Sequence, residues 1–185
     1  MRVISGSAKG RALKPAGAAT RPITDRVKEN LFNILAGQVL EANVLDLFAG
    51  AGSVGIEALS RGARAATFVE LDRDALRAIR ANLDATRLGA HAQIARLDVF
   101  KFIRHTQEQY DLIYIAPPQY RELWAETLKT LDGRGLLAAD GIIVAQIHPK
   151  EYKEIALTEF ELFDQRKYGS TMLCFYRRVQ PATRT

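Results

Sequence analysis

The fold of this chain is decided by residues 44–55, which read VLDLFAGAGSVG. The segment begins as a short apolar strand, passes through a glycine-rich turn and continues with residues that can start a helix. This is the arrangement by which the edge of a parallel sheet holds a nucleotide-containing cofactor. Residues 44–55 therefore predict an α/β fold with a cofactor site at the end of its first strand.

Strand and helix patterns alternate on the C-terminal side of this segment. Apolar runs predict strands over 44–48, 65–70, 92–97, 110–115, 141–147, 160–167 and 172–177. Helical periodicity predicts helices over 24–35, 53–61, 72–86, 99–105 and 120–131, with a helical turn over 152–155. The alternation indicates a doubly wound, mostly parallel sheet with helices on both faces. A tight turn at Gly169-Ser170 predicts that the last two strands are antiparallel neighbours.

The length of 185 residues suits a single domain with a full core. We expect residues 1–20 to form a short β-hairpin or arm, and residues 179–185 to be a frayed tail. The single cysteine, Cys174, excludes an internal disulfide and a cysteine metal cluster, so we expect no metal site. The longest apolar stretch, 135–147, is interrupted by Asp140 and is too short to span a bilayer. These features predict a monomeric, cytoplasmic protein.

Positive charge is concentrated at the two ends of the chain. The net charge is +5, yet residues 1–28 hold seven Lys or Arg and one acid, and residues 166–185 hold five and none. Residues 29–165 hold 14 basic and 20 acidic residues. If the two ends lie close together, they form a basic face on an acidic body, which suits a phosphate backbone. The alternative is that the charges are solvated termini that maintain solubility.

One acidic residue, Asp46, distinguishes the glycine turn from a dinucleotide site. Gly50, Gly52 and Gly55 match the pattern G-x-G-x-x-G, which by itself is weak evidence for NAD. Asp46 precedes the first glycine by four residues, where its carboxylate would repel a pyrophosphate at the helix N-terminus. The same carboxylate would attract a cofactor with a cationic amino-acid part, such as S-adenosylmethionine. Gly50 and Gly52 would let the backbone approach that cofactor closely, and an NAD-dependent oxidoreductase is the weaker hypothesis.

Three acids, Asp46, Glu70 and Asp98, follow three successive predicted strands. Because parallel strands end at the same edge of a sheet, all three can face one crevice. Glu70 can accept hydrogen bonds from both ribose hydroxyls, and Asp98 can accept one from the adenine amino group near the Val99 backbone. The alternative is that Asp46 and Asp98 cap turns or helices, as Asp72 is expected to do.

A second motif, Ala116-Pro117-Pro118, follows the predicted strand 110–115. Two prolines fix the backbone and remove two N–H donors, which leaves a rigid edge of carbonyl groups. These carbonyls can accept both hydrogens of an exocyclic amine on a base and orient its nitrogen toward an electrophilic methyl group. Tyr120 can stack on a base that is turned out of its helix. The alternative is that the prolines only end a strand and that Tyr120 packs on the next helix.

With these motifs in place, the chain resembles the RsmD family, the bacterial 16S ribosomal RNA guanine-N2 methyltransferases. The resemblance covers almost the whole chain, and its most specific parts are the Arg-Pro segment 20–29 and Tyr168-Gly169. It is also carried by residues 2–6, 9–11, 46–52, 68–70, 117–118 and 167–171.

The resemblance implies a Class I, Rossmann-like fold dependent on S-adenosylmethionine, with a seven-stranded sheet whose last strand is antiparallel. It implies methyl transfer to the 2-amino group of one guanine in 16S ribosomal RNA, on an assembling small ribosomal subunit. Arg21 and Thr24 would lie over the cofactor or the target base, and the arm 1–20 would touch RNA. Phe48 and Leu71, beside the expected strand ends, complete the expected cofactor-binding set.

One departure from the family pattern concerns Ala116. The family usually has Asp or Asn at this position, followed directly by two prolines and an aromatic residue, whereas here Gln119 precedes Tyr120. A main-chain carbonyl at Ala116 or Pro117 can still orient the amine, and losing one side-chain contact would cost about 1–3 kcal/mol. Gln119 can supply part of the missing contact. Two alternatives stay open: a non-catalytic RNA-binding assembly factor, and an amine methyltransferase that acts on another RNA or on DNA.

Overall fold

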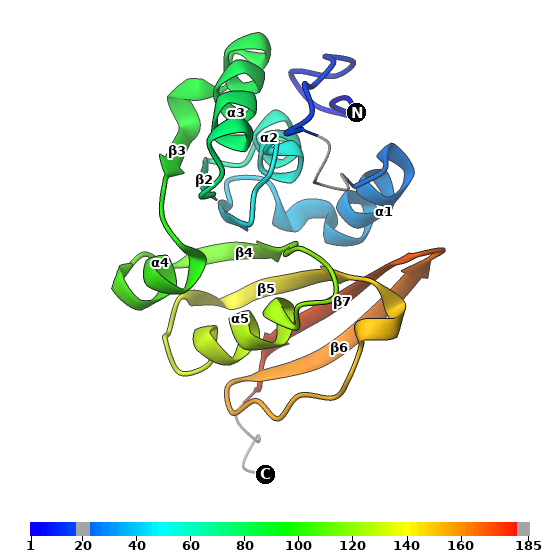
Figure 1. The fold of residues 1–185 in the computed structure, drawn as a ribbon, viewed down its shortest axis with the longest axis vertical. Helices are drawn as coiled ribbons and strands as arrows, with labels where there is room; N and C mark the ends of the chain where they lie inside the picture. Colours follow the sequence, from blue (N-terminus) through cyan, green and yellow to red (C-terminus); the bar gives the residue numbers. More distant parts are fainter. Residues whose placement is uncertain (18–22, 181–185) are drawn as a thin grey trace.

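The computed structural model describes residues 1–17 and 23–180. Its strands form one sheet: β1 Asn43–Leu47, β2 Ala65–Val69, β3 Ala92–Ala95, β4 Tyr110–Ile115, β5 Leu137–Ile147, β6 Phe160–Tyr168 and β7 Thr171–Arg178. Their order is β3-β2-β1-β4-β5-β7-β6 (Figure 1). Only β7 is antiparallel to its neighbours, β5 and β6. The predicted seven-stranded, mostly parallel sheet with an antiparallel last strand is confirmed.

Helices cover both faces of this sheet. They are α1 Asp25–Leu35, α2 Ser53–Ser60, α3 Arg73–Thr86, α4 Val99–His105 and α5 Leu123–Leu131. Apolar side chains of α1, α2 and α3 form one core with one face of the sheet, and those of α4 and α5 form a second core with the other face. Figure 1 shows the same division, with α1, α2 and α3 grouped above β4 and with α5 below it. The predicted doubly wound architecture is confirmed.

Strand β1 shows how the sequence builds the site into the middle of the sheet. Leu45 and Leu47 pack in the core shared with α4 and α5, whereas Val44 packs in the core shared with the other helices. Because side chains alternate along a strand, Asp46 faces the same side as Val44. A strand covered on both faces is normally apolar throughout, so a carboxylate at this position makes Asp46 a candidate functional residue.

Three predicted elements begin three or more residues away from their place in the structure, and the bounds of the other predicted helices and strands differ by at most two residues. Helix α5 begins at Leu123 rather than at residue 120, because Tyr120 and Glu122 have left-handed φ angles of 61° and 56°. Strand β5 begins at Leu137 rather than at residue 141, and its pairing with β4 shifts register between Tyr110 and Leu112. The helical turn lies at Pro149–Glu151 (η3) rather than at 152–155, since proline favours the first position of a helix.

The N-terminal segment folds back on itself as an arm. A single antiparallel bridge joins Arg2 to Ala12, and Val3 both donates to the Arg11 carbonyl and accepts from the Gly10 N–H. The arm is therefore looser than a regular hairpin. At the other end, the Val179 N–H donates to the Glu159 carbonyl at 2.8 Å, so the predicted fraying does not begin at residue 179. Residues 18–20 of the arm and 181–185 of the tail lie outside the described residues.

In the described part of the chain, none of the helices has both the length and the apolar character that a membrane span requires.

Candidate active site

The glycine turn lies between the end of β1 and the start of α2. Gly50 and Gly52 have φ angles of 56° and 75°, in the left-handed region where a side chain is costly. A Cβ atom on Gly50 would meet no heavy atom within 4 Å, so a ligand has room to approach this backbone. A Cβ atom on Gly55 would lie 2.4 Å from Phe68 Cε1. The third glycine therefore serves the close packing of α2 on β2.

Asp46 is buried at the end of β1, with 2% of its surface exposed. The Gly55 N–H, in the first turn of α2, donates to Asp46 Oδ2 at 3.0 Å. Burial raises the pKa of Asp46 to about 8, because this hydrogen bond compensates only in part and Glu70 adds repulsion. Among the described residues, Asp46 Oδ1 receives no hydrogen bond. A cationic ligand would stabilise the ionised carboxylate, so the structure agrees with the expected preference for a cation.

Glu70 joins the glycine turn to the end of β2. Its Oε2 accepts from the Gly50 N–H at 2.9 Å, and its Oε1 accepts from the N–H groups of Leu71 and Asp72 at 2.7 and 2.9 Å. A carboxylate offers about four acceptor sites, and three are occupied. Glu70 can thus accept one further hydrogen bond. To accept hydrogen bonds from both ribose hydroxyls, it would have to lose one of its three hydrogen bonds from backbone N–H groups.

A cavity of about 700 Å³ opens at the carboxyl ends of the central strands. This volume lies within the range of small-molecule and cofactor sites. The cavity brings together residues that the sequence assigned to cofactor binding and to the acceptor. The predicted residues in its lining are Asp46, Phe48, Gly50, Glu70, Ala116, Pro117 and Pro118. Phe48 has a left-handed φ angle of 60°, a strained conformation that often occurs at functional sites.

Asp98 is not part of this lining. It precedes α4, where its side chain accepts from the Lys101 N–H at 3.0 Å and caps the helix, while Val99 is buried in the first turn. The capping alternative therefore describes the observed contact of Asp98, and its contact with adenine stays a prediction. Asp72 caps α3, as expected, and it also lines the cavity together with Asp74.

Three other predicted cofactor residues, Gly52, Leu71 and Thr24, also lie outside the lining. Gly52 is the residue before α2, and Leu71 is 57% exposed. Thr24 caps α1 by accepting from the Val27 N–H at 3.3 Å. Arg21 lies outside the described residues. The expected contacts of these four residues with a cofactor or a base stay predictions.

The acceptor side of the cavity follows β4. The Ala116 N–H donates to the Leu47 carbonyl at 3.4 Å, which ties the start of the proline motif to the end of β1. Tyr120 stands outside the lining at the rim, with 67% of its surface exposed. Its N–H donates to Glu151 Oε1 at 2.6 Å, and its ring centroid lies 5.4 Å from that of His148. The tyrosine is therefore available to solvent rather than packed on α5.

Two polar residues of the acceptor side were not predicted from the sequence. Tyr114 of β4 and Gln146 of β5 both line the cavity, and the Tyr114 hydroxyl donates to Gln146 Oε1 at 2.6 Å. Gln146 follows Ala145, which pairs with Ile115, so it lies beside Ala116. The sequence signal for these two residues was a polar side chain among the apolar residues of a predicted strand. That signal does not show which residues of other strands lie beside them.

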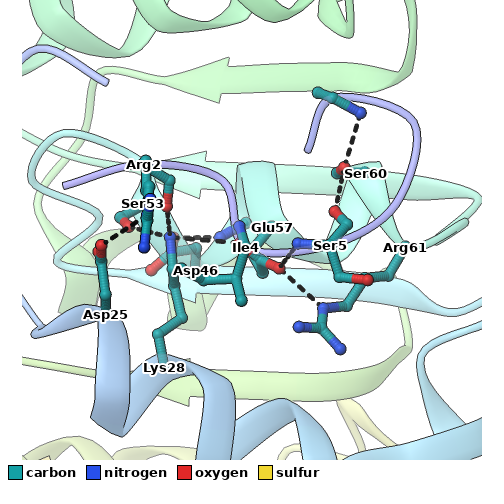
Figure 2. Close-up of polar contacts among 12 residues, drawn as sticks. Arg2, Ile4, Ser5, Asp25, Lys28, Asp46, Ser53, Glu57, Ser60 and Arg61 are labelled. Atoms are coloured by element: carbon teal, nitrogen blue, oxygen red, sulfur yellow. Dashed lines mark hydrogen bonds and ion pairs between the residues drawn. The ribbon is translucent and has the colours of Figure 1, made fainter. Parts of the chain in front are cut away.

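A buried ion pair joins α1 to α2 next to the cofactor side of the cavity (Figure 2). Lys28 Nζ lies 3.3 Å from Glu57 Oε2, and both side chains are fully buried. Lys28 Nζ also donates to Ser53 Oγ at 3.0 Å and to the Arg2 carbonyl at 2.6 Å. Burial lowers the pKa of Lys28, and the adjacent Glu57 carboxylate opposes that shift. Since Ser53 lines the cavity, this pair connects α1, α2 and the arm to the site.

The arm is held on α2 by the same acid and by a serine. The N–H groups of Ile4 and Ser5 donate to the Glu57 carboxylate at 2.8 and 3.0 Å. Ser60 Oγ donates to the Ser5 carbonyl at 2.6 Å and accepts from the Ala8 N–H at 2.9 Å (Figure 2). These contacts fix the arm so that its last described residues, 15–17, form part of the cavity wall.

Among the described residues, the basic side chains at the end of β7 do not join the basic N-terminal arm in one face. Strand β7 leads away from the cavity edge of the sheet, and Arg178 Nε donates to the Leu137 carbonyl at the start of β5. Figure 1 shows the end of β7 far from the N-terminal arm. Lys28 is buried rather than exposed. Exposed positive charge at the cavity comes from Arg121 in its lining, and the arm that leads to its wall carries exposed Lys9, Arg11 and Lys14.

Comparison with protein families gives a match over most of the chain. A family model described as "Conserved hypothetical protein 95" matches residues 1–177. A Bacillus subtilis (strain 168) protein described as "Putative rRNA methyltransferase YlbH" is 42% identical over 185 residues, covering 96% of this chain and 99% of the relative. The "Ribosomal RNA small subunit methyltransferase D" of Escherichia coli (strain K12) is 33% identical over 179 residues, covering 96% and 90% of the two chains.

A solved structure supports the same relationship. The "Putative methyltransferase yhhF from Escherichia coli" superimposes with a TM-score of 0.86 and 32% sequence identity. The match covers 96% of this chain and 97% of that one. The similarity therefore extends over the sheet, both helical layers and the arm.

Proposed function

This chain belongs to the RsmD family of ribosomal RNA methyltransferases, and we propose that it methylates the exocyclic 2-amino group of a guanine in 16S ribosomal RNA. The methyl donor in this proposal is S-adenosylmethionine. Methylation of ribosomal RNA agrees with the names of its relatives. The choice of the guanine 2-amino group rests on the family resemblance and on the carbonyl edge after β4.

The observation that carries the proposal is the shared cavity. Asp46, Glu70 and the glycine turn lie on one side of it, and Ala116 and Pro117 lie on the other. A methyl transfer needs the donor and the acceptor to meet in one space with their reacting atoms aligned. A cavity that served only to bind a nucleotide would not need the carbonyl edge.

The residues of the cofactor side fit S-adenosylmethionine. The partnerless Asp46 Oδ1 is suited to bind its ammonium group, and the remaining acceptor site of Glu70 is suited to a ribose hydroxyl. The open space beside Gly50 allows close approach of the backbone. When bound, this cofactor supplies an electrophilic methyl group on a positively charged sulfur.

The acceptor side orients the amine of the base. We assign to the carbonyl groups of Ala116 and Pro117 the role of accepting its two hydrogens. That geometry turns the nitrogen lone pair toward the cofactor side, and the carbonyl dipoles stabilise the positive charge that develops on the nitrogen. Tyr120, exposed at the rim, supplies a surface on which the extruded base stacks.

The arm provides the contact with the RNA backbone in this proposal. Lys9, Arg11 and Lys14 are exposed, and none of them forms an ion pair within the described residues. Because the arm continues into the cavity wall at residues 15–17, phosphates bound there would place RNA over the cavity entrance. Ribosomal RNA as a substrate places the protein in the bacterial cytoplasm.

The test is transfer of tritium from labelled S-adenosylmethionine to small ribosomal subunits that lack base methylation, followed by nucleoside analysis. We expect the label in N2-methylguanosine. Small subunits that already carry their methyl groups are the matched control and should take up no label.

A non-catalytic assembly factor is the second candidate, and Ala116 favours it because a side-chain acceptor for the amine is absent there. That candidate predicts binding of both cofactor and RNA without label transfer. Label in another nucleoside would show methyl transfer but overturn the assignment to guanine N2.

A further inference from the structure

The Tyr114–Gln146 pair has no role in the methyl transfer described above. Tyr114 is 3% exposed, and its hydroxyl lies 2.6 Å from Gln146 Oε1 inside the cavity. Ile115 and Ala145 are partners across the parallel strands β4 and β5. The next residues, Ala116 and Gln146, are therefore neighbours at the carboxyl edge, about 4.8 Å apart as adjacent strands are. Gln146 thus stands beside the carbonyl edge that would hold the amine.

The hydroxyl of Tyr114 determines how the amide of Gln146 is turned. Burial and the nearby Asp46 carboxyl raise the pKa of Tyr114 well above its ordinary value, so the hydroxyl keeps its proton and acts as a hydrogen-bond donor. The amide oxygen of Gln146 accepts this hydrogen bond, which leaves the amide nitrogen as the free end of the side chain. Among the described residues, Gln146 Nε2 has no acceptor. Two N–H donors are therefore available to a ligand in the cavity.

We propose that Gln146 Nε2 donates a hydrogen bond to O6 of the target guanine and so selects guanine over bases that lack this acceptor. The inference rests on the proposed function and adds a specificity-determining residue to it. The 2-amino group and O6 lie on the same edge of guanine, on either side of N1. A base whose amine is held after β4 would turn O6 toward β5, where Gln146 lies.

The donor character of Gln146 also excludes other bases. Adenine carries an amino group where guanine carries O6, so two donors would face each other and neither would find an acceptor. Leaving both groups without partners in a partly enclosed cavity disfavours adenine. The small side chain of Ala116, next to Gln146, leaves the amide accessible to the base.

The experiment compares guanine with 2-aminopurine, which keeps the 2-amino group and lacks O6. Small subunits are reconstituted with 16S RNA that carries one or the other base at the target position. For the wild type and for Gln146→Leu, kcat/KM is measured with each substrate. We expect Gln146→Leu to lower kcat/KM for guanine by about 10-fold and to leave that for 2-aminopurine nearly unchanged.

Two further variants separate recognition from structure. Tyr114→Phe removes the hydroxyl that orients the amide, and we expect a smaller loss of selectivity, about 3-fold. Gln109→Leu alters a glutamine near the opposite edge of the sheet, where its Nε2 donates to the Gly135 carbonyl, and should change neither substrate's rate. A merely structural role of Gln146 would lower both rates together and would weaken cofactor binding in calorimetry, which would overturn the proposal.

The outcome also distinguishes this inference from the proposed function. If the wild type methylates guanine and Gln146→Leu keeps the same preference, only the role of Gln146 is overturned. If the wild type transfers no methyl group to guanine while cofactor binding is intact, the proposed function fails, and the role of Gln146 fails with it.

Discussion

The cofactor side and the acceptor side of the cavity are held by different means. Asp46 and Gly55 are buried, and the ion pair of Lys28 with Glu57 supports the glycine turn from within the core. On the acceptor side, Tyr120 is 67% exposed, and the loop after it is held by an ion pair of exposed side chains, Glu122 with Lys153. The difference shows that the cofactor side is fixed before any ligand binds, whereas the rim of the acceptor side at Tyr120 can adjust to a large substrate.

The largest expected effect tests the support beneath the cofactor side. Lys28→Met would leave the buried Glu57 carboxylate with Arg61 and two backbone N–H groups as its remaining partners. Breaking a buried pair in this way should lower the free energy of unfolding by about 3 kcal/mol. Urea-induced unfolding measures this loss. Arg177→Met, which breaks an exposed pair with Glu161, is the control and should cost less than about 1 kcal/mol. Equal losses in the two variants would contradict the contrast.

The next effect is smaller per pH unit and concerns the charge of Asp46 without ligand. Its pKa is raised from 3.8 to about 8, so between these values the folded protein holds a proton that the unfolded chain has released. The free energy of unfolding should therefore fall as pH rises from about 4 to about 8, by at most about 1.4 kcal/mol per pH unit from this group. Asp46→Asn cannot ionise and should remove this contribution. Parallel pH profiles for the two proteins, from urea unfolding at pH 5 to 8, would refute the prediction.

Binding of the cofactor should depend on the same carboxylate. We expect Asp46→Ala to weaken S-adenosylmethionine binding by about 10- to 100-fold, because an interaction with a charged group is lost. Titration calorimetry measures the affinity, and circular dichroism checks that the variant is folded. Asp111→Ala is a matched control, since Asp111 accepts from the Asn43 N–H at the opposite edge of the sheet. Unchanged affinity in Asp46→Ala would remove Asp46 from the cofactor site.

The smallest effect belongs to the exposed side. Tyr120→Ala should lower RNA methylation by about 10-fold through lost base stacking, while cofactor affinity stays unchanged. Tyr120→Phe keeps the ring and should retain most activity. The test measures the rate of RNA methylation by kinetics and the cofactor affinity by calorimetry for both variants. A loss of cofactor affinity in Tyr120→Ala would mean that the two sides are not independent.

The position of the glycine turn and of Asp46 beside a cavity at the end of β1 could be predicted because the signals are local in the sequence. A buried strand, an acid and three glycines follow one another over residues 44–55, and each residue type has a physical reason to be there. The parallel sheet with helices on both faces also followed from the alternation of strands and helices, whereas the order of the strands was not predicted. Asp98 shows the limit, since an aspartate between a strand and a helix suits a ligand and a cap equally, and its observed contact is a cap.

The missed residues depend on contacts between distant parts of the chain. Lys28 lies in an amphipathic helix, where a lysine is normally solvated, and only the tertiary fold places it against Glu57. The register of β5 against β4 places Gln146 beside Ala116, and the Tyr114 hydroxyl orients its amide. Neither the register nor the burial of a single polar residue is encoded in its immediate neighbours.

The contacts of the arm also limit the stage of folding at which the arm can dock. Its anchors, Glu57 and Ser60, follow its contact residues in the chain by more than 50 positions. Gly6 must come so close to α2 that a Cβ atom there would lie 1.7 Å from the Ser60 carbonyl oxygen. Since the arm is synthesised before α2 exists, it has no partner until β1 and α2 have formed. The cavity wall at residues 15–17 can thus close only after α2 has formed, although that segment is among the first to be made.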